Sequence, residues 1–274
     1  MLTKRLNNGV EIPVIGLGTY RIGRTDEETY RAVRTALEAG YRHIDTATLY
    51  ANERPVGRAI RESGIPREAI FVTTKLWGSD ILSGYIREAF ESSLLNLGLD
   101  YVDLYLVHWP VQGKLNFTWK AMEQICHSGR ARAIGVSNHL IHHLEALLRE
   151  ATIVPAVNQM ELHPYLNQKE VVKYGSERGI LPESWSPLGS SKIPLLQDET
   201  LRLIGAKYDK SPAQVVLRWN VDKGFVAIPK SSDAARQKEN IRIFDFQLTG
   251  EEIGQIDALN RNYRTGLHPD KIAF

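Results

Sequence analysis

The chain has 274 residues, 43% of them apolar and 24% charged, which is the composition of a globular protein. Its 34 basic and 32 acidic residues leave a net charge of +2, too balanced for us to expect nucleic-acid binding. No apolar run approaches the roughly 20 residues of a membrane span, and the first residues lack the apolar core of a signal peptide. We therefore expect a cytoplasmic protein. The single cysteine, Cys126, excludes an intramolecular disulfide and is interpreted as structural.

The chain begins with a pattern typical of a β-hairpin. Val10, Ile12 and Val14 alternate with other residues after Asn8-Gly9, a dipeptide that favours a tight turn. From there, short β-branched runs alternate with longer segments of helical periodicity. The predicted strands cover residues 14–18, 42–45, 70–75, 102–108, 131–136, 156–159, 180–185 and 225–228. The predicted helices cover residues 26–38, 54–62, 79–97, 117–126, 140–149, 168–177 and a 197–223 stretch broken at Pro212.

Eight strands in strict alternation with helices favour a (β/α)8 TIM barrel with an N-terminal β-hairpin and extra C-terminal helices. Glu251 and Glu252 after Thr249 are typical of the first turn of such a C-terminal helix. An open doubly wound sheet is disfavoured because the glycine pair at Gly16 and Gly18 lacks the third glycine of the dinucleotide-binding fingerprint. No linker-like segment interrupts the pattern, so we expect one domain over residues 1–274.

Residues with useful chemistry follow nearly every predicted strand, where the active sites of (β/α)8 barrels lie. Four of them suit proton transfer: Asp45, Tyr50, Lys75 and His108. An ammonium group near a phenol lowers its pKa and makes it a better general acid. A carboxylate beside that lysine would keep it charged, and an imidazole could orient a carbonyl oxygen.

Each of these residues also has an ordinary interpretation. Asp45 and Tyr50 could make only loop hydrogen bonds, Lys75 could be a solvated strand end, and His108 could be a satisfied core histidine. Trp77 and Trp109 could be plain packing. A barrel lysine can also form a Schiff base, so a Lys75 aldolase is an alternative enzyme. A second alternative is a nucleotide-sensing subunit that binds the cofactor but turns over poorly. The shared position of these residues at one end of the barrel favours catalysis.

The motifs in these positions resemble those of the aldo-keto reductase superfamily. They are Gly16-Leu-Gly-Thr19, Asp45-Thr-Ala47 with Tyr50-Ala-Asn-Glu53, Thr74-Lys-Leu-Trp77, the run from Leu99 to Pro110, Ile134-Gly-Val-Ser-Asn138, Val157-Asn-Gln159, Trp185-Ser-Pro-Leu188, and Ile228-Pro-Lys-Ser231 followed by Arg236, Glu239 and Asn240. The resemblance runs from about Gly9 to Pro269. It is strongest to the short bacterial branch of glyoxal, methylglyoxal and 2,5-diketo-gluconate reductases.

The resemblance implies an enzyme that reduces small aldehydes, ketones and α-dicarbonyls with NADPH. It makes Tyr50 the general acid, Lys75 and Asp45 the pair that tunes it, and His108 the residue that orients the carbonyl. It implies that the nicotinamide end of NADPH/NADP+ is held by Ser137, Asn138 and Gln159 with Trp185 stacked on the ring. The remaining implied cofactor-binding residues are Gly18, Thr19, Ser186, Leu188, Lys230, Ser231, Arg236, Glu239 and Asn240. The resemblance implies that Lys230, Ser231 and Arg236 clamp the adenosine 2′-phosphate, a role that the charge and hydrogen-bonding geometry of Lys and Arg suit.

The implied substrate pocket is lined by Tyr20, Trp77, His108 and Trp109. Because the chain ends soon after Gly266, we expect that pocket to be open. We expect a monomer whose partner is a small carbonyl substrate, with no nucleic acid and no membrane.

Two residues depart from the family pattern, and three histidines raise the possibility of a metal site. His139 stands where relatives usually carry phenylalanine, and Pro182 lies in a predicted strand, which it is expected to weaken. His139, His142 and His143 share a helix face but lack acidic or cysteine partners at ligand spacing in the sequence. We therefore interpret them as a solvated face and expect no metal.

Overall fold

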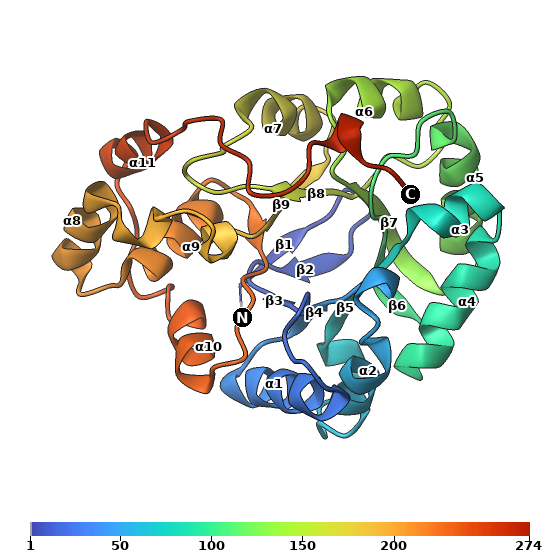
Figure 1. Ribbon diagram of the computed structural model, residues 1–274, viewed down its shortest axis with the longest axis horizontal. Helices are drawn as coiled ribbons and strands as arrows, with labels where there is room; N and C mark the ends of the chain where they lie inside the picture. Colours follow the sequence, from blue (N-terminus) through green and yellow to red (C-terminus); the bar gives the residue numbers. More distant parts are fainter. Residues whose placement is uncertain (1) are drawn as a thin grey trace.

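The computed structural model describes residues 2–274 and shows eight parallel strands surrounded by helices (Figure 1). Neighbouring strands of the sheet follow the chain order, so each crossover is a single step around the barrel. The strands are β3 (Leu17–Gly18), β4 (His43–Asp45), β5 (Phe71–Leu76), β6 (Val102–Val107), β7 (Ala131–Ser137), β8 (Val157–Glu161), β9 (Leu181–Trp185) and β10 (Val226–Ala227).

The first and last strands close the barrel through their backbones. Ile15 and Ala227 form a parallel bridge, and Gly18 donates its N–H to the carbonyl of Pro229 at 3.2 Å. A side chain on Gly18 would place its Cβ only 2.8 Å from the carbonyl oxygen of Ile228. Glycine is therefore needed here for a close backbone approach. The (β/α)8 expectation is confirmed.

The N-terminal hairpin is confirmed and covers one end of the barrel. It consists of β1 (Thr3–Arg5) and β2 (Glu11–Pro13), joined by a turn in which Gly9 has φ 88°. Its Leu6 and Ile12 are buried in one apolar cluster with side chains of the barrel strands, such as Leu104. The hairpin therefore seals the end opposite the polar strand ends.

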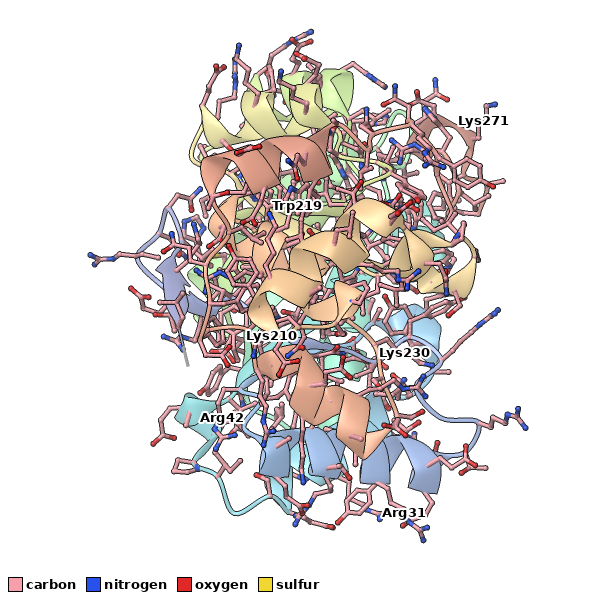
Figure 2. All side chains as sticks on the ribbon, turned by 90° about the vertical axis from the view of Figure 1, so that its left-hand side faces the viewer. Arg31, Arg42, Lys210, Trp219, Lys230 and Lys271 are labelled. Carbon is pink, nitrogen blue, oxygen red and sulfur yellow. The ribbon has the colours of Figure 1, made fainter. Side chains whose placement is uncertain are left out.

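Helices cover the outside of the sheet in chain order (Figure 1). They are α1 (Asp26–Ala39), α2 (Glu53–Arg61), α3 (Gly78–Ser83), α4 (Ile86–Leu97), α5 (Leu115–His127), α6 (Ile141–Leu148), α7 (Lys169–Ser176), α8 (Glu199–Tyr208), α9 (Pro212–Asp222), α10 (Ala234–Ile241) and α11 (Gly250–Asp257). On the side shown in Figure 2, α8, α9 and α11 lie next to one another, and Trp219 is buried among them. None of the helices formed by residues 2–274 has the length and apolar character needed to cross a membrane.

Two local expectations need comment. The single helix predicted over residues 79–97 is wrong, because Gly84 adopts φ 81° and ends α3 before α4 begins. Pro182 does not interrupt β9, although proline cannot donate to the ladder. The backbone N–H of Leu181 donates to the carbonyl of Ala156 on the β8 side, whereas the backbone nitrogen of the next residue, Pro182, faces the other side. The pairing of β9 with β8 is therefore continuous through Pro182.

Candidate active site at the carboxyl ends of the strands

An ion pair between Lys75 and Asp45 lies at the centre of the site. Asp45 ends β4, Lys75 lies in β5, and both side chains are buried. The Nζ atom of Lys75 lies 2.6 Å from Oδ1 of Asp45 and 2.9 Å from the carbonyl oxygen of Thr46. Its third contact is the hydroxyl of Tyr50 at 3.4 Å. The structure thus brings three of the four predicted proton-transfer residues into direct contact.

The loop after β4 holds the Tyr50 phenol in this position. Tyr50 ends the short 3-10 helix η1 (Thr48–Tyr50), and the hydroxyl of Thr48 donates to the carbonyl of Lys75 at 3.1 Å. Asn52 accepts a hydrogen bond from the hydroxyl of Thr46 at 2.7 Å and donates to the carbonyl of Thr19 at 2.9 Å. These contacts fasten the loop to two neighbouring strand ends.

Burial dominates the pKa of Tyr50 but not that of Lys75. Burial disfavours the charge on Lys75, but Asp45 and Tyr50 outweigh it and leave the pKa of Lys75 above its ordinary value. For Tyr50, burial raises the pKa to about 12 and outweighs the lowering effect of Lys75. Lys75 lowers the pKa of the phenol, as expected, but the loss of solvation is the larger effect and keeps that pKa above its ordinary value. Tyr50 holds its proton at neutral pH.

His108 lies beside the phenol and carries no charge. Its ring centroid is 5.6 Å from that of Tyr50 and 5.3 Å from that of Trp77. Burial, with a smaller effect of Lys75, holds the pKa of His108 well below its usual range. Its Nδ1 atom finds no hydrogen-bond partner among residues 2–274. A neutral imidazole in this place can donate one N–H to a carbonyl oxygen next to Tyr50.

Aromatic side chains surround this group, and the chain end reaches one of them. Tyr20 is half exposed with its ring 5.0 Å from that of Tyr50, and Trp77 and Trp109 are half-buried at neighbouring strand ends. Phe274 packs edge-on against Trp77 at 5.2 Å. The expectation of an uncovered pocket is therefore wrong, because the last residues cross the end of the barrel (Figure 1).

A second polar group lies on β7, β8 and β9. The hydroxyl of Ser137 donates to the carbonyl of Gln159 at 2.8 Å, and Asn138 donates to the carbonyl of His108 at 3.0 Å. Asn138 has φ 62°, a left-handed conformation that asparagine tolerates. Trp185 donates its indole N–H to Asn138 at 2.8 Å. The structure therefore brings together all four residues to which the resemblance assigns the nicotinamide end.

The remaining residues of the expected cofactor path have structural partners of their own. The buried hydroxyl of Thr19 donates to the carbonyl of Asp45 at 2.9 Å, next to Gly18 at the barrel closure. Ser186 has φ 49° and hydrogen-bonds the hydroxyl of Ser190. Leu188 is half-buried and packs against the apolar core.

The predicted phosphate-binding residues lie at the start of α10. Lys230 is exposed, and the side chain of Arg236 is 73% exposed and 3.9 Å from Asp233, so both cations are accessible. Ser231 is buried and accepts the backbone N–H of Asp233 at 3.2 Å. An anion at this helix N-terminus would also meet a favourable dipole.

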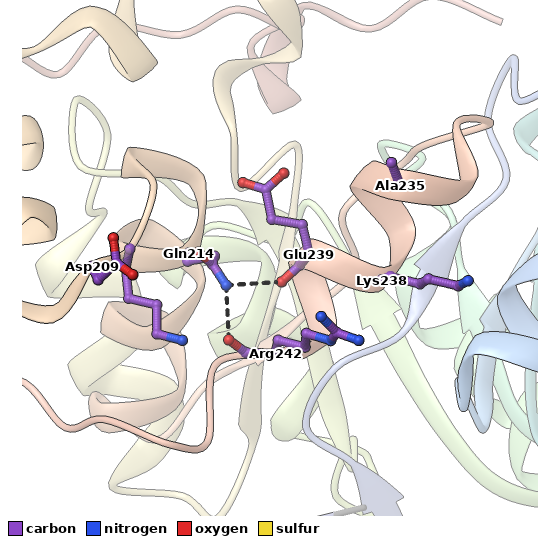
Figure 3. A pocket seen from close by; sticks show the side chains of 7 residues that line it. Asp209, Gln214, Ala235, Lys238, Glu239 and Arg242 are labelled. Atoms are coloured by element: carbon purple, nitrogen blue, oxygen red, sulfur yellow. Dashed lines mark hydrogen bonds between the residues drawn. The ribbon is translucent and has the colours of Figure 1, made fainter.

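Glu239 and Asn240 lie farther along α10, where the structure gives them other contacts. Asn240 is buried beside Tyr41, and the carboxylate of Glu239 accepts a hydrogen bond from the hydroxyl of Ser211. Glu239 and Arg242 also line a cavity of about 400 Å³ between α9 and α10 (Figure 3). The amide of Gln214 bridges their carbonyl oxygens there, at 3.2 and 2.8 Å.

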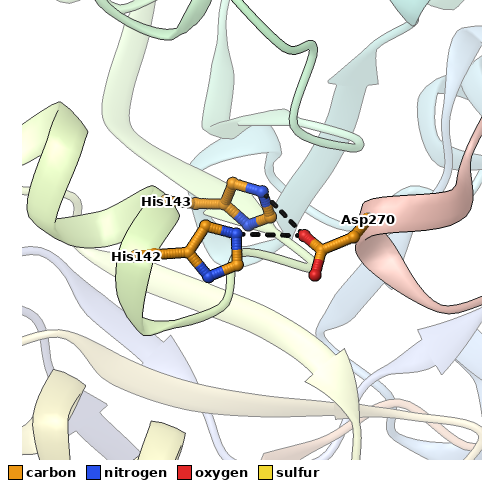
Figure 4. Close-up of side chains that lie close together, drawn as sticks. All are labelled: His142, His143 and Asp270. Carbon is orange, nitrogen blue, oxygen red and sulfur yellow. Dashed lines mark hydrogen bonds and ion pairs between the residues drawn. The ribbon is translucent and has the colours of Figure 1, made fainter.

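The histidine group on α6 has an acidic partner that the sequence spacing hid. His142 and His143 lie 3.0 and 3.2 Å from one oxygen of Asp270, in the 3-10 helix η5 (Pro269–Lys271) (Figure 4). Their side chains and Asp270 could together approach a metal ion. However, Nδ1 of His143 already accepts the backbone N–H of Leu140 at 3.1 Å, so only the Nε2 atom of this ring faces Asp270. His139 is buried, which corrects the interpretation of all three as a solvated face.

Sequence reasoning missed three residues that shape this end of the barrel. Phe274 and Asp270 contact residues that lie more than 100 positions away in the sequence, so no local pattern indicates their partners. Glu183 on β9 is fully buried, and Gln159 donates a hydrogen bond to it at 3.2 Å. The available signal in the sequence was an acidic residue, Glu183, inside the strand predicted over residues 180–185.

Comparison with known proteins gives the family of this chain. The model of the Aldo/keto reductase family matches residues 14–261. The chain is 49% identical to glyoxal reductase of Bacillus subtilis (strain 168), with 99% of this chain and 98% of that protein covered. It is 41% identical to methylglyoxal reductase DkgA of Escherichia coli (strain K12), with 97% and 96% covered.

Solved structures agree with the sequence relatives. The aldo-keto reductase MGS-M4, from a Medee basin deep-sea metagenome library, superposes with a TM-score of 0.96 at 44% identity and covers 99% of this chain and 100% of that one. The aldo/keto reductase of Brucella melitensis gives a TM-score of 0.89 at 47% identity, with 94% and 99% covered. The chain belongs to the aldo/keto reductase family.

Proposed function

We propose that this enzyme reduces small aldehydes, ketones and α-dicarbonyls such as methylglyoxal, glyoxal and keto-sugars, with NADPH as the reductant and Tyr50 as the proton donor. The observation that carries the proposal is the contact of Lys75 with both Asp45 and the phenol of Tyr50, at 2.6 and 3.4 Å. The names of the relatives, glyoxal reductase and methylglyoxal reductase, support the substrate class.

The residues present fit a nicotinamide cofactor. Trp185 offers a half-buried flat ring beside the polar groups of Ser137 and Asn138, and Lys230 and Arg236 offer accessible cations at the start of α10. A bound NADPH would supply the hydride to the carbonyl carbon. Two cations, one able to bind a phosphate through two hydrogen bonds, suit a 2′-phosphate and favour NADPH over NADH.

The residues of the protein orient the carbonyl group and donate one proton to its oxygen. His108 is neutral and able to donate an N–H to the carbonyl oxygen, which holds that oxygen beside the phenol of Tyr50. As negative charge develops on the oxygen, Tyr50 gives up its proton. The ammonium of Lys75 stabilises the phenolate that forms, and Asp45 keeps that ammonium charged in the buried site.

The geometry argues against the Schiff-base alternative at Lys75. Its amine is fully buried and makes three hydrogen bonds, and its pKa lies above the ordinary value. A nucleophilic lysine needs the opposite, a neutral amine with access to substrate. Borohydride treatment in the presence of substrate is therefore expected to trap no adduct.

An NADPH-oxidation screen tests the proposal and separates it from the sensor alternative. We expect turnover with methylglyoxal and glyoxal, and with aromatic aldehydes and keto-sugars as further candidates. NADPH binding without oxidation across this panel would favour a sensing subunit. A lysine adduct after borohydride treatment would favour an aldolase.

A further inference from the structure

Glu183 is a fully buried acid inside the barrel that the mechanism above does not use. It lies in β9, paired in register with Gln159 of β8 and Val226 of β10. His43 approaches from β4, with Nε2 3.6 Å from Oε1 of Glu183 and 3.2 Å from the hydroxyl of Thr73. A Cβ on Gly16 would lie 2.7 Å from the His43 ring, so a glycine there makes room for this imidazole.

Gln159 connects Glu183 to the ion pair of the site. Its Nε2 atom donates to Oδ2 of Asp45 at 2.8 Å and to Oε2 of Glu183 at 3.2 Å. Both hydrogens of the amide are therefore used, and the other oxygen of Asp45 binds Lys75 at 2.6 Å. If the amide were turned over, its oxygen would face the Asp45 carboxylate, which is repulsive. The contacts form one chain from Lys75 through Asp45 and Gln159 to Glu183.

We propose that Glu183 is a positioning residue of the proton-donor site: it holds Gln159 and thereby Asp45 in place, and the charge of its carboxyl group sets the electrostatic environment of Lys75 and Tyr50. This inference rests on the function proposed above, and it assigns no contact between Glu183 and the substrate.

The charge balance inside the barrel explains why this carboxyl group matters. Lys75 and Asp45 together are neutral, so an ionised Glu183 would add one uncompensated negative charge. Burial and the nearby Asp45 raise the pKa of Glu183 to about 8, against smaller opposing effects of Gln159 and Lys75. Burial lowers the pKa of His43 to about 3, so this ring stays neutral and cannot compensate. The facing residues Val226 on β10 and Gln159 on β8 carry no charge.

The sign of the effect follows from these charges. Below pH 8 Glu183 is neutral, and Lys75 can stabilise the phenolate of Tyr50 without competition. Above pH 8 the new negative charge disfavours a phenolate nearby and slows proton donation. The pKa of Tyr50 is about 12 and that of Lys75 is raised, so these groups do not titrate between pH 7 and 9.5. Of these three groups, Glu183 is the one that changes charge in this interval.

The kinetic test compares wild type with Glu183→Gln, which keeps an acceptor for Gln159 but has no charge at any pH. We expect wild-type kcat to fall about three- to tenfold between pH 7 and 9.5. This range corresponds to a change of about half to one unit in the pKa of the proton donor. Glu183→Gln is expected to keep its NADPH affinity and its kcat at pH 7 within about twofold and to lose this decline. Glu183→Leu, which also removes the acceptor, is expected to lower kcat at pH 7 itself. Glu123→Gln is the matched control, because Glu123 is a buried acid that caps backbone amides far from the site.

A second measurement does not depend on catalysis and separates this proposal from the proposed reductase activity. The side-chain carboxyl carbon of Glu183 can be followed by 13C NMR and assigned by its absence in Glu183→Gln. We expect it to titrate near pH 8 in wild type and at a higher pH in Lys75→Met, where a stabilising cation is lost. Titration in the ordinary carboxyl range, or no change in Lys75→Met, would overturn the proposal even in an active reductase. A pH profile of Glu183→Gln identical to wild type would overturn it as well.

Discussion

The indole N–H of Trp185 donates a hydrogen bond to the side-chain oxygen of Asn138 at 2.8 Å. Asn138 in turn donates to the carbonyl of His108 at 3.0 Å, so the plane of the indole is tied to the strand end that carries the imidazole. The other edge of the ring is covered by Gly266, where an added Cβ would lie 2.5 Å from the indole. Trp185 is thus fixed on both sides before any cofactor binds.

This arrangement predicts the behaviour of two variants of Trp185. Trp185→Phe keeps a flat ring but loses the hydrogen bond, which is worth about 0.5–1.5 kcal/mol, so NADPH affinity should fall about three- to tenfold. Trp185→Ala also loses the ring and should weaken binding further and remove much of the tryptophan quenching by NADPH. Trp219→Phe is the control, because Trp219 is buried among α8, α9 and α11 (Figure 2). Unchanged quenching in Trp185→Ala would show that this ring does not meet the nicotinamide.

The exposed cations at the start of α10 predict cofactor preference. A charge-assisted hydrogen bond is worth about 1.5–3 kcal/mol, so Arg236→Ala should weaken NADPH binding about ten- to a hundredfold and leave NADH binding nearly unchanged. Titration calorimetry with both cofactors measures the difference. Arg242→Ala serves as the matched control, since Arg242 directly follows the same helix but lines the cavity of Figure 3. Equal losses for NADPH and NADH in Arg236→Ala would refute the phosphate contact.

The contact of Asp270 with His142 and His143 predicts how the chain end is held over the pocket. Asp270→Asn weakens both contacts of Figure 4, so amides of residues 267–274 should exchange hydrogen faster, while those of the barrel strands stay protected. Phe274→Ala should alter the KM for bulky aldehydes more than for methylglyoxal, because it uncovers Trp77. Asp245→Asn, at an exposed ion pair far from this end, is the control for hydrogen exchange. Exchange in Asp270→Asn that matches wild type would show that these contacts do not hold the segment.

Glu252 predicts a pH-dependent contribution to stability. It receives hydrogen bonds from the amide of Thr249 at 2.9 Å and the hydroxyl of Tyr208 at 2.7 Å, and its ion pair with Lys207 measures 3.0 Å. Burial alone would raise the pKa of Glu252, but these partners lower it to about 2, below the unfolded value of about 4.3.

Because the folded pKa is the lower one, the stabilisation is present above about pH 4.3 and is lost as the pH falls toward 2. Glu252→Gln should therefore lower the free energy of unfolding by about 1–3 kcal/mol at pH 7 and flatten its decline in acid. Urea unfolding at several pH values measures this, with the exposed neighbour changed in Glu251→Gln as control. An acid decline in Glu252→Gln as steep as in wild type would assign the effect to other groups.

Much of the fold could be predicted because the strands and helices of a parallel barrel each have a strong local pattern in the sequence. Each strand is a short β-branched run, and parallel strands expose their carboxyl ends at one end of the barrel. The sequence positions of Asp45, Lys75 and His108 therefore already predicted that these residues lie together. Their polar partners in the loops, such as Thr46 and Asn52, lie close in sequence to these strand ends.

The remaining features depend on contacts that no local pattern records. Gly84 ends a helix whose periodicity continues on both sides, so the break could not be read from hydrophobic spacing. The pKa of Tyr50 depends on how far burial outweighs Lys75, which only the three-dimensional packing determines. Phe274 meets Trp77 and Asp270 meets His143 across most of the chain length.

The central claim is that the phenol of Tyr50 delivers the proton, and kcat of Tyr50→Phe tests it most directly. This change keeps the ring that packs beside Tyr20 and His108 and removes only the hydroxyl that Lys75 contacts. General acid catalysis contributes about 10²–10⁴-fold, so kcat should fall at least about a hundredfold while NADPH affinity and Tm barely change. A folded Tyr50→Phe enzyme that binds NADPH and keeps more than about a tenth of wild-type kcat would contradict the account.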